Sequence, residues 1–346
     1  MIELRSDNAA GVAPEILDAV SGANSGSALA YGGDDLTAHL HEVVREVFEH
    51  GSARVFPVTS GTAANSLSIS AATPPWGAVL CHHSAHIITA EGGATSLFGG
   101  GAVMQGVDGA HGLIDPESLR TALESVRWGD PHESQPSVLS LTVPSDVGTV
   151  YRPEEVVELT GIAGQRGLRV HLDGARLANA VVALGCAPAD VTWRAGVDVV
   201  SLGATKNGAL SAEAIVVFDE RIADELVYRT KRSGHVTSKM RFQSAQLSAY
   251  LADGLWLRLA GGANRRMAEL VAGLATVDGV RLAERVDVNM AFVELPGPAI
   301  DALGDAGVLF YRMGPTSVRL VTSWQTTSAE VAEAVAVFRQ AARVGS

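Results

Sequence analysis

The chain reads Leu168-Arg169-Val170-His171-Leu172-Asp173-Gly174-Ala175-Arg176, a strand-like run that ends in an acid, a glycine and a basic residue. A second strand-like run, Val197–Ser201, leads into Gly203-Ala204-Thr205-Lys206-Asn207. Lys206 follows Asp173 by 33 residues, about the length of one strand–helix–strand unit. Both polar groups therefore fall beyond the carboxyl ends of parallel strands, the edge where open α/β sheets bind their ligands.

The rest of the N-terminal two thirds repeats this alternation of strand-like and helix-like segments. Asp115 and Pro116 have the residue types of an N-cap and a first helical position, and they mark the start of one helix. Strands separated by helices imply right-handed crossovers, so we expect an α/β fold whose mainly parallel sheet carries helices on both faces. The expected strands span 53–58, 78–81, 138–141, 168–172, 197–201 and 214–218, and a helix spans 62–72.

The pattern changes near residue 240. The segment Gln243–Arg266 predicts one long or broken helix, and Thr327 with Glu330 forms a capping box ahead of a final helix over 331–343. Between them we expect strands at 280–283, 290–295 and 318–321. We therefore predict a large domain over residues 1–245 and a smaller C-terminal α+β domain over 246–346, with the N-terminal segment free to pack on the smaller one.

The composition is that of an acidic globular chain. Among 346 residues, 38 Asp and Glu against 26 Lys and Arg give a formal net charge of −12, which repels nucleic-acid phosphates. No apolar run reaches about 18 residues, so no membrane span is expected. The first residues lack the pattern of a signal peptide, and two cysteines, Cys81 and Cys186, are too few for a disulfide framework. We expect a cytoplasmic enzyme that binds neither nucleic acid nor membranes.

Asp173 and Lys206 have the residue types that pyridoxal phosphate requires. A lysine amine forms a Schiff base with an aldehyde, and an aspartate keeps the pyridine nitrogen of this cofactor protonated, so that the ring accepts electrons. Either residue alone is more simply explained as a strand-end acid or a surface lysine. Their pairing at one sheet edge, flanked by Gly, Ala and Thr where the backbone must come close, favours the cofactor.

A candidate cradle for the phosphate follows the first expected strand. The residues Thr59-Ser60-Gly61-Thr62 lead from that strand into a helix, whose N-terminus offers unpaired N–H groups and the positive end of the helix dipole. Ser60 and Thr62 add hydroxyl donors, and Thr205 adds another beside the lysine. An ordinary capped helix is the simpler explanation of this turn taken alone.

Histidines cluster in Cys81-His82-His83-Ser84-Ala85-His86. Cys and His are zinc ligands, but the spacing is not that of a zinc site and no second Cys/His group follows, so no metal is predicted. His86 begins an apolar run and precedes Glu91, and it is the candidate to stack on the pyridine ring. His82 and His83 are explained as loop residues.

Together these motifs resemble those of the threonine aldolases, within the fold-type-I, β-eliminating lyase group of pyridoxal phosphate enzymes. The resemblance covers nearly the whole chain, and its most specific matches are residues 171–176 and Val318-Arg319-Leu320-Val321-Thr322. The Gly-Ala-Thr-Lys-Asn form around Lys206 is similar to that of the phenylserine aldolases. Further matches are Leu4-Arg5-Ser6-Asp7, Tyr31-Gly32-Gly33-Asp34, Ser60-Gly61-Thr62-Ala63-Ala64-Asn65, and Ala85-His86 followed by Glu91-Gly92.

The resemblance implies a role for each matching residue. Lys206 would be the Schiff-base lysine, Asp173 the partner of the pyridine nitrogen, His86 the stacking histidine, and His132 a second catalytic histidine near the substrate hydroxyl. The implied cofactor-binding residues are Ser60, Gly61, Thr62, His86, Asp173, Arg176, Thr205, Lys206 and Arg241. The implied substrate-binding residues are Ser6, Tyr31, Arg176 and Arg319.

The resemblance also implies an assembly. Tyr31 and the segment Lys231–Arg241, a region with a phosphate contact in the family, would enter the site of a neighbouring subunit. A homo-oligomer with shared active sites, either a dimer or a tetramer, is therefore expected. Two positions depart from the family pattern and bear on substrate preference: Val143 stands where many members have an asparagine beside the cofactor, and Asn8 replaces a more usual threonine.

The activity implied by the resemblance is retro-aldol cleavage of β-hydroxy-α-amino acids to glycine and an aldehyde, with L-threonine, L-allo-threonine and L-phenylserine as substrates. A tryptophanase-like β-eliminating lyase would use the same lysine, aspartate and phosphate turn, so the sequence leaves this alternative open. A catalytically idle scaffold is less favoured, because the lysine, the aspartate and both arginines are present. A metal hydrolase on His82–His86 is weaker still.

Overall fold

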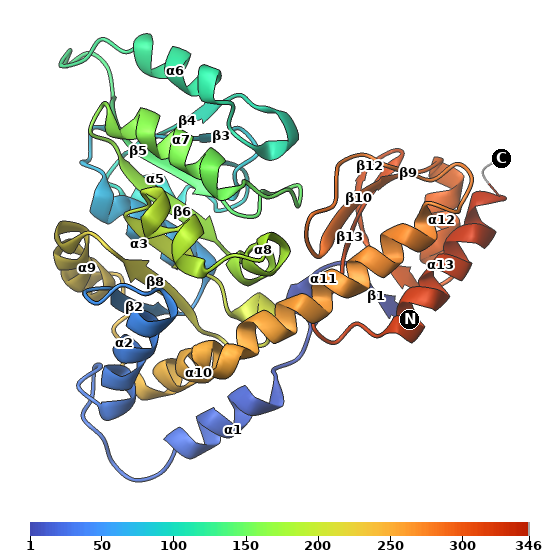
Figure 1. Ribbon diagram of the computed structural model, residues 1–346, viewed down its shortest axis with the longest axis horizontal. Helices are drawn as coiled ribbons and strands as arrows, with labels where there is room; N and C mark the ends of the chain where they lie inside the picture. Colours follow the sequence, from blue (N-terminus) through green and yellow to red (C-terminus); the bar gives the residue numbers. More distant parts are fainter. Residues whose placement is uncertain (345–346) are drawn as a thin grey trace.

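The computed structural model describes residues 1–344 and contains a large sheet covered by helices and a smaller sheet beside it (Figure 1). All neighbouring strands of the large sheet are parallel, except that one strand, β8 (Glu213–Val217), is antiparallel to both of its neighbours. The prediction of a mainly parallel sheet is therefore confirmed. The seven strands lie in the order β2 (Arg54–Val58), β8 (Glu213–Val217), β7 (Val199–Leu202), β6 (Arg169–Gly174), β5 (Gln135–Thr142), β3 (Gly77–His82) and β4 (Val103–Val107).

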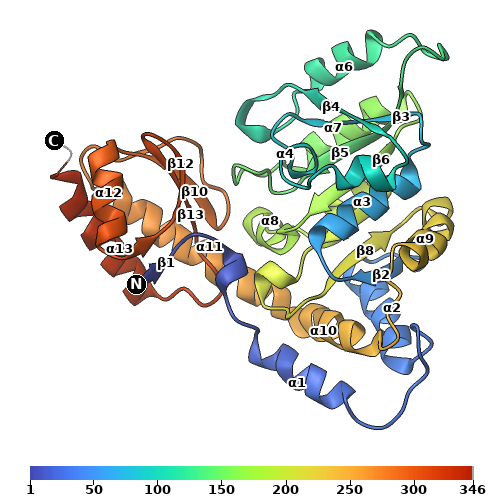
Figure 2. The same ribbon diagram turned by 180° about the vertical axis from the view of Figure 1, so that it is seen from behind.

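Helices cover both faces of this sheet. They are α2 (Asp35–Val47), α3 (Gly61–Ala72), α4 (His86–Thr89), α5 (Ala94–Phe98), α6 (Pro116–Glu124), α7 (Pro153–Gly164), α8 (Leu177–Leu184) and α9 (Glu220–Arg232). Side chains alternate between the faces: Ile215 and Val217 of β8 pack with α3 and α9, whereas Val216 joins the core beneath α7 and α8. Figure 2 shows α3 and α9 on their face of the sheet. The predicted N-cap of α6 is confirmed, because Asp115 Oδ2 accepts from Ser118 N (2.8 Å).

The segment predicted as one long or broken helix is two helices. These are α10 (Arg241–Leu251) and α11 (Leu255–Leu274), and between them Asp253 has a left-handed φ of 50°. α10 packs against α1 (Pro14–Ala23) and α2 beside the large sheet, and α11 runs from there to the smaller sheet (Figure 1). The predicted domain boundary between residues 245 and 246 falls inside α10 and stays a prediction.

The smaller sheet is antiparallel, with the order β12 (Tyr311–Gly314), β13 (Ser317–Val321), β10 (Met290–Glu294) and β9 (Arg281–Leu282). α12 (Gly297–Asp305) and α13 (Ser328–Ala342) pack on it around a second core, and the predicted capping box opens α13. β1 (Ile2–Glu3) pairs with β11 (Val308–Leu309) and joins this core. β12 was not predicted, because its side chains are largely exposed and lack an apolar alternation. None of the helices in residues 1–344 is both long and apolar enough to cross a membrane.

Candidate active site

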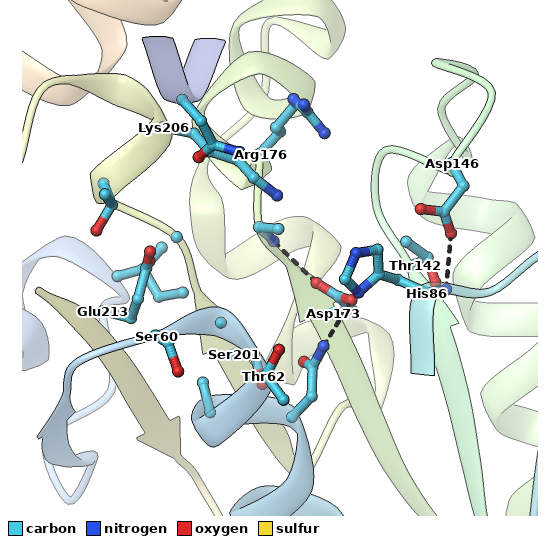
Figure 3. A pocket seen from close by; sticks show the side chains of 18 of the residues that line it. Ser60, Thr62, His86, Thr142, Asp146, Asp173, Arg176, Ser201, Lys206 and Glu213 are labelled. Atoms are coloured by element: carbon cyan, nitrogen blue, oxygen red, sulfur yellow. Dashed lines mark hydrogen bonds between the residues drawn. The ribbon is translucent and has the colours of Figure 1, made fainter. Parts of the chain in front are cut away.

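A pocket of about 360 Å³ lies at the carboxyl ends of β5, β6 and β7, the edge predicted from the sequence (Figure 3). Glu213 also reaches this edge, because an antiparallel strand begins where its parallel neighbours end. The predicted site residues that line the pocket are Ser6, Ser60, Gly61, Thr62, His86, Asp173, Arg176, Thr205, Lys206 and Arg319.

Lys206 lies on a short 3-10 helix, Thr205–Asn207, that follows β7. Asn207 anchors this turn, since its Nδ2 donates to Tyr250 Oη (2.9 Å) and to the carbonyl of Trp256 (2.8 Å). Burial, together with the positive charge of Arg176, lowers the pKa of Lys206. A lowered pKa favours the neutral, nucleophilic amine that Schiff-base chemistry requires.

The carboxylate of Asp173 is buried and held by two hydrogen bonds. Ala175 N donates to Oδ1 (3.0 Å), and Asn65 Nδ2 donates to Oδ2 (2.9 Å). The same Asn65 amide donates to Glu91 Oε1 (2.8 Å), so it lies between two buried carboxylates and bonds to both, while Glu91 Oε2 is buried without a hydrogen-bond partner in residues 1–344. These bonds fix the orientation of Asp173 at the pocket wall.

His86, at the start of α4, belongs to the same network. Its Nδ1 donates to Glu91 Oε1 (2.9 Å), and its backbone N–H donates to Asp146 Oδ2 (3.0 Å). The hydrogen bond to Glu91 and the nearby charge of Asp146 raise the pKa of His86. Burial raises the pKa of Asp146 to about 6. Sequence reasoning assigned no role to Asp146, since it lies in a loop without a motif, and none to Asn65 and Glu91, although both stand in the matched motifs.

The turn into α3 has the geometry of an anion cradle. Ser60 is the N-cap, and its Oγ accepts from Ala63 N (3.2 Å), so the simpler explanation of a capped helix is also correct. The first N–H groups of a helix have no partner within it and remain available to an anion. Gly61 and Thr62 line the pocket, and a Cβ placed on Gly61 would meet no atom within 4 Å.

Arg176 lines the pocket, but its guanidinium is already paired. Its Nε and Nη2 donate to the two oxygens of Asp7 (2.7 and 2.9 Å), and Asn289 Nδ2 also donates to Asp7 (3.1 Å). Burial opposes both charges, but the pairing outweighs it: the pKa of Asp7 is lowered and that of Arg176 is raised. Arg319 Nε, by contrast, is buried without a hydrogen-bond partner in residues 1–344. Arg319 therefore keeps more hydrogen-bonding capacity for a substrate carboxylate than Arg176 does.

Replacing Asp7 by asparagine is expected to lower the free energy of unfolding by about 3–5 kcal/mol, because the buried Arg176 loses its counter-charge. The folded pKa of Asp7 is lowered, so its stabilisation is present above the unfolded pKa of about 3.9 and is lost as the pH falls through the folded value. Denaturant unfolding at pH 7 measures the effect. The control is Glu3→Gln, which removes the exposed pair with Arg5 and should cost less than about 1 kcal/mol. Equal losses in the two variants would contradict the buried pair.

Three predicted site residues lie elsewhere. His132 is exposed in the turn before β5, and its Nδ1 donates to Asp130 Oδ1 (2.8 Å). The start of a parallel strand lies at the edge opposite the pocket, so His132 lies away from the pocket of its own chain, and its catalytic role stays a prediction. Tyr31 is 58% exposed, with Lys231 Nζ 4.6 Å from its ring centroid. Arg241 begins α10, and its Nη1 donates to the carbonyl of Gly26 (3.4 Å).

The histidine cluster makes ordinary loop contacts. His82 Nδ1 accepts from Ser84 N (3.1 Å), and its Nε2 donates to the carbonyl of Gly109 (3.1 Å). His83 Nε2 lies 3.2 Å from Asp108 Oδ1. Over residues 1–344, no group of three or more His, Cys, Asp or Glu side chains is placed to hold a metal ion.

Comparison with known proteins identifies the family of this chain. The family model described as beta-eliminating lyase matches residues 3–296. The chain is 40% identical to a low specificity L-threonine aldolase from Pseudomonas aeruginosa, over 96% of this chain and 95% of the relative, and 38% identical to one from another Pseudomonas species, over 97% of each. It is similar in structure to a threonine aldolase from Leishmania major, with a TM-score of 0.91, 28% identity, and coverage of 97% of this chain and 98% of that one. The chain has the fold-type-I architecture and belongs to the beta-eliminating lyase family, in the group that contains the threonine aldolases.

Proposed function

We propose that this chain is a pyridoxal phosphate-dependent aldolase that cleaves L-threonine, L-allo-threonine and L-phenylserine to glycine and an aldehyde. The observation that carries the proposal is the convergence of Lys206, Asp173 and Arg319 on one pocket, with a helix N-terminus at the same pocket. The named activity of the Pseudomonas relatives supports the choice of aldol cleavage.

The donor set of the pocket fits the cofactor. Lys206 would hold its aldehyde carbon covalently, Asp173 its pyridine nitrogen, and the α3 N-terminus with Ser60, Thr62 and Thr205 its phosphate. Pyridoxal phosphate, when bound, supplies an electron sink for the negative charge left at Cα. The lowered pKa of Lys206 and the fixed orientation of Asp173 are the protein's contributions to that binding.

The remaining pocket groups orient the substrate and move its proton. The guanidinium of Arg319 binds the substrate carboxylate, with Ser6 Oγ and the third nitrogen of Arg176 as further donors. Glu91 holds His86 Nδ1, which leaves His86 Nε2 to exchange a proton with the β-hydroxyl. Asp146, whose pKa burial raises to about 6, is a second group of this pocket able to exchange that proton near neutral pH.

Product analysis tests the proposal against β-elimination. The enzyme is incubated with L-threonine, L-allo-threonine and L-phenylserine, and products are identified by mass spectrometry. Glycine with acetaldehyde or benzaldehyde in equal amounts is expected. A 2-oxo acid with ammonia would assign the chain to the eliminating lyases instead, and no turnover of any substrate by cofactor-loaded protein would make it an idle scaffold.

The variant Arg319→Lys is expected to raise KM for L-threonine by roughly 10- to 100-fold, because an ammonium group cannot reproduce the planar fork that binds a carboxylate. The absorbance spectrum of the bound cofactor should not change. Steady-state kinetics with a spectrum of the same preparation measures both. The matched control is Arg312→Lys, on exposed β12 and paired with Asp301, which should leave KM unchanged. An unchanged KM in Arg319→Lys would remove this residue from the substrate site.

We further propose that the active unit is a homo-oligomer with shared sites. Tyr31, Tyr228, Lys231 and Met240 line one surface pocket, and exposed Leu29 lies two residues before Tyr31. Arg241 follows Met240 in the sequence, and its Nε is buried without a hydrogen-bond partner in residues 1–344. An apolar surface with an unsatisfied basic group fits contact with a second copy, whose phosphate cradle would satisfy that group.

Mixing two inactive variants tests this assembly. In a two-fold dimer of Lys206→Ala and Tyr31→Ala chains, one site receives both wild-type residues. After exchange, the mixture should regain roughly a quarter of wild-type activity, because half of the dimers are mixed and each has one complete site. Activity assays are combined with native mass spectrometry, which reports the mixed species. Mixed dimers without activity would contradict the shared site.

A further inference from the structure

A glutamate stands at the phosphate cradle, where a basic residue would be expected. Glu213 is the first residue of β8 and pairs across strands with Val58, the last residue of β2, directly ahead of the turn Thr59-Ser60. It is 7% exposed and lines the same pocket as Ser60 and Thr205. Figure 3 shows its side chain on the same side of the pocket as Ser60, away from His86 and Asp146.

The backbone just before Lys206 binds the carboxylate of Glu213. Its Oε2 accepts from Ala204 N (2.6 Å), whereas the neighbouring Thr205 Oγ1 donates to the carbonyl of Ala212 (3.4 Å). The titratable groups that interact with it are Lys206, on this turn, and Tyr250, on α10, whose hydroxyl is occupied by Asn207 and by the carbonyl of Gly203. Val58, Ser60 and Thr62 bring no charge from β2 and α3.

The cradle thus combines donors for a phosphate with a buried acid. Two negative charges, a carboxylate and a phosphate, repel each other in one buried site. This repulsion favours protonation of one of the two groups. A neutral carboxyl group has an O–H that donates to a phosphate oxygen, whereas an ionised one only accepts.

We propose that Glu213 takes up a proton when pyridoxal phosphate binds, so that it holds the phosphate as a neutral O–H donor and makes cofactor affinity dependent on pH. The inference rests on the proposed function, because it concerns the same cofactor. Burial raises the pKa of Glu213 to about 7, so this carboxyl group can gain a proton near neutral pH even in the free protein.

The affinity for pyridoxal phosphate is expected to depend on pH through the protonation of Glu213. Below about pH 7 the free carboxyl is already protonated, and binding requires no uptake. Above it, the free carboxylate must gain a proton on binding, so affinity for the phosphate falls as the pH rises. Pyridoxal, which has the same aldehyde and ring but no phosphate, makes no such demand.

Calorimetry of the full-length chain, stripped of cofactor, measures the uptake. Pyridoxal phosphate or pyridoxal is titrated at pH 8 in two phosphate-free buffers of different ionisation enthalpy, into wild type and Glu213→Gln. Wild type should take up about one proton more than Glu213→Gln with pyridoxal phosphate, and the two proteins should agree with pyridoxal. Asp198→Asn, which removes a partly buried carboxyl outside the pocket, should behave as wild type does in this comparison.

A second measurement on wild type alone guards against a variant that does not fold. Between pH 7.5 and 8.5, the ratio of the Kd for pyridoxal phosphate to the Kd for pyridoxal should rise by up to about tenfold. Pyridoxal phosphate binding with neither the extra proton nor the rise in this ratio would overturn the role of Glu213 and leave the proposed function intact. Absence of pyridoxal phosphate binding would overturn both.

Discussion

Lys206→Ala is expected to lower turnover of L-threonine by roughly 10³-fold or more, because the chain loses the amine that bonds to the cofactor. The substitution removes a partly buried amine and leaves the anchoring bonds of Asn207 in place, so the fold should persist. Steady-state kinetics with a coupled aldehyde assay measures the loss, and circular dichroism checks the fold.

The chain contains three lysines, which makes the control simple. Lys239 is exposed and lies outside the pocket, so Lys239→Ala should retain wild-type turnover. Turnover of Lys206→Ala within a few-fold of wild type would exclude Lys206 from the reaction.

The second large effect is expected for Asp173→Asn. The amide keeps the size of the carboxylate but only one acceptor oxygen, which can serve Asn65 Nδ2 or Ala175 N but not both, and it removes the charge that holds a proton on a pyridine nitrogen. Breaking a buried charge pair of this kind costs about 3–5 kcal/mol, which corresponds to a loss of roughly 10²- to 10⁴-fold in kcat.

Asp198, at the opposite end of a neighbouring strand, provides the control. It separates the loss of the Asp173 charge in the pocket from the loss of any aspartate in this part of the sheet. Asp198 precedes β7, and its Oδ2 accepts from Val170 N (2.7 Å), away from the pocket. Asp198→Asn is therefore expected to lower stability and to leave kcat near wild type. If Asp173→Asn kept near-normal turnover, or if Asp198→Asn matched its loss, the role of Asp173 would be wrong.

The lysine and the aspartate were predictable because the physics that places them is local. β6 and β7 are short runs of apolar and β-branched residues, and a helical crossover between them makes them parallel, so the residues after each strand meet at one edge. The N-cap Ser60 was predictable for the same reason, since its role depends on its immediate neighbours.

The residues that sequence reasoning missed depend on pairings over long distances. Glu213 reaches the pocket only because β8 is antiparallel to its neighbours, and the residues of a strand do not indicate in which direction it runs. Asp7 lies 169 residues before Arg176 and neutralises its charge. Arg176 therefore has less capacity to bind a substrate carboxylate than Arg319 has. His132 is the opposite case: the resemblance assigned it to the site, but it precedes its strand, and the edge rule alone places it at the far edge of the sheet.

The proposed chemistry requires a covalent bond between Lys206 and the cofactor, and one measurement tests that bond directly. The purified holoenzyme is reduced with borohydride, which converts the link to a stable secondary amine, and is then digested and mapped by mass spectrometry. We expect a pyridoxyl phosphate group on the peptide that contains Lys206, with Lys231 and Lys239 unmodified. A group on Lys231 or Lys239, or none on a protein that turns over L-threonine, would contradict it.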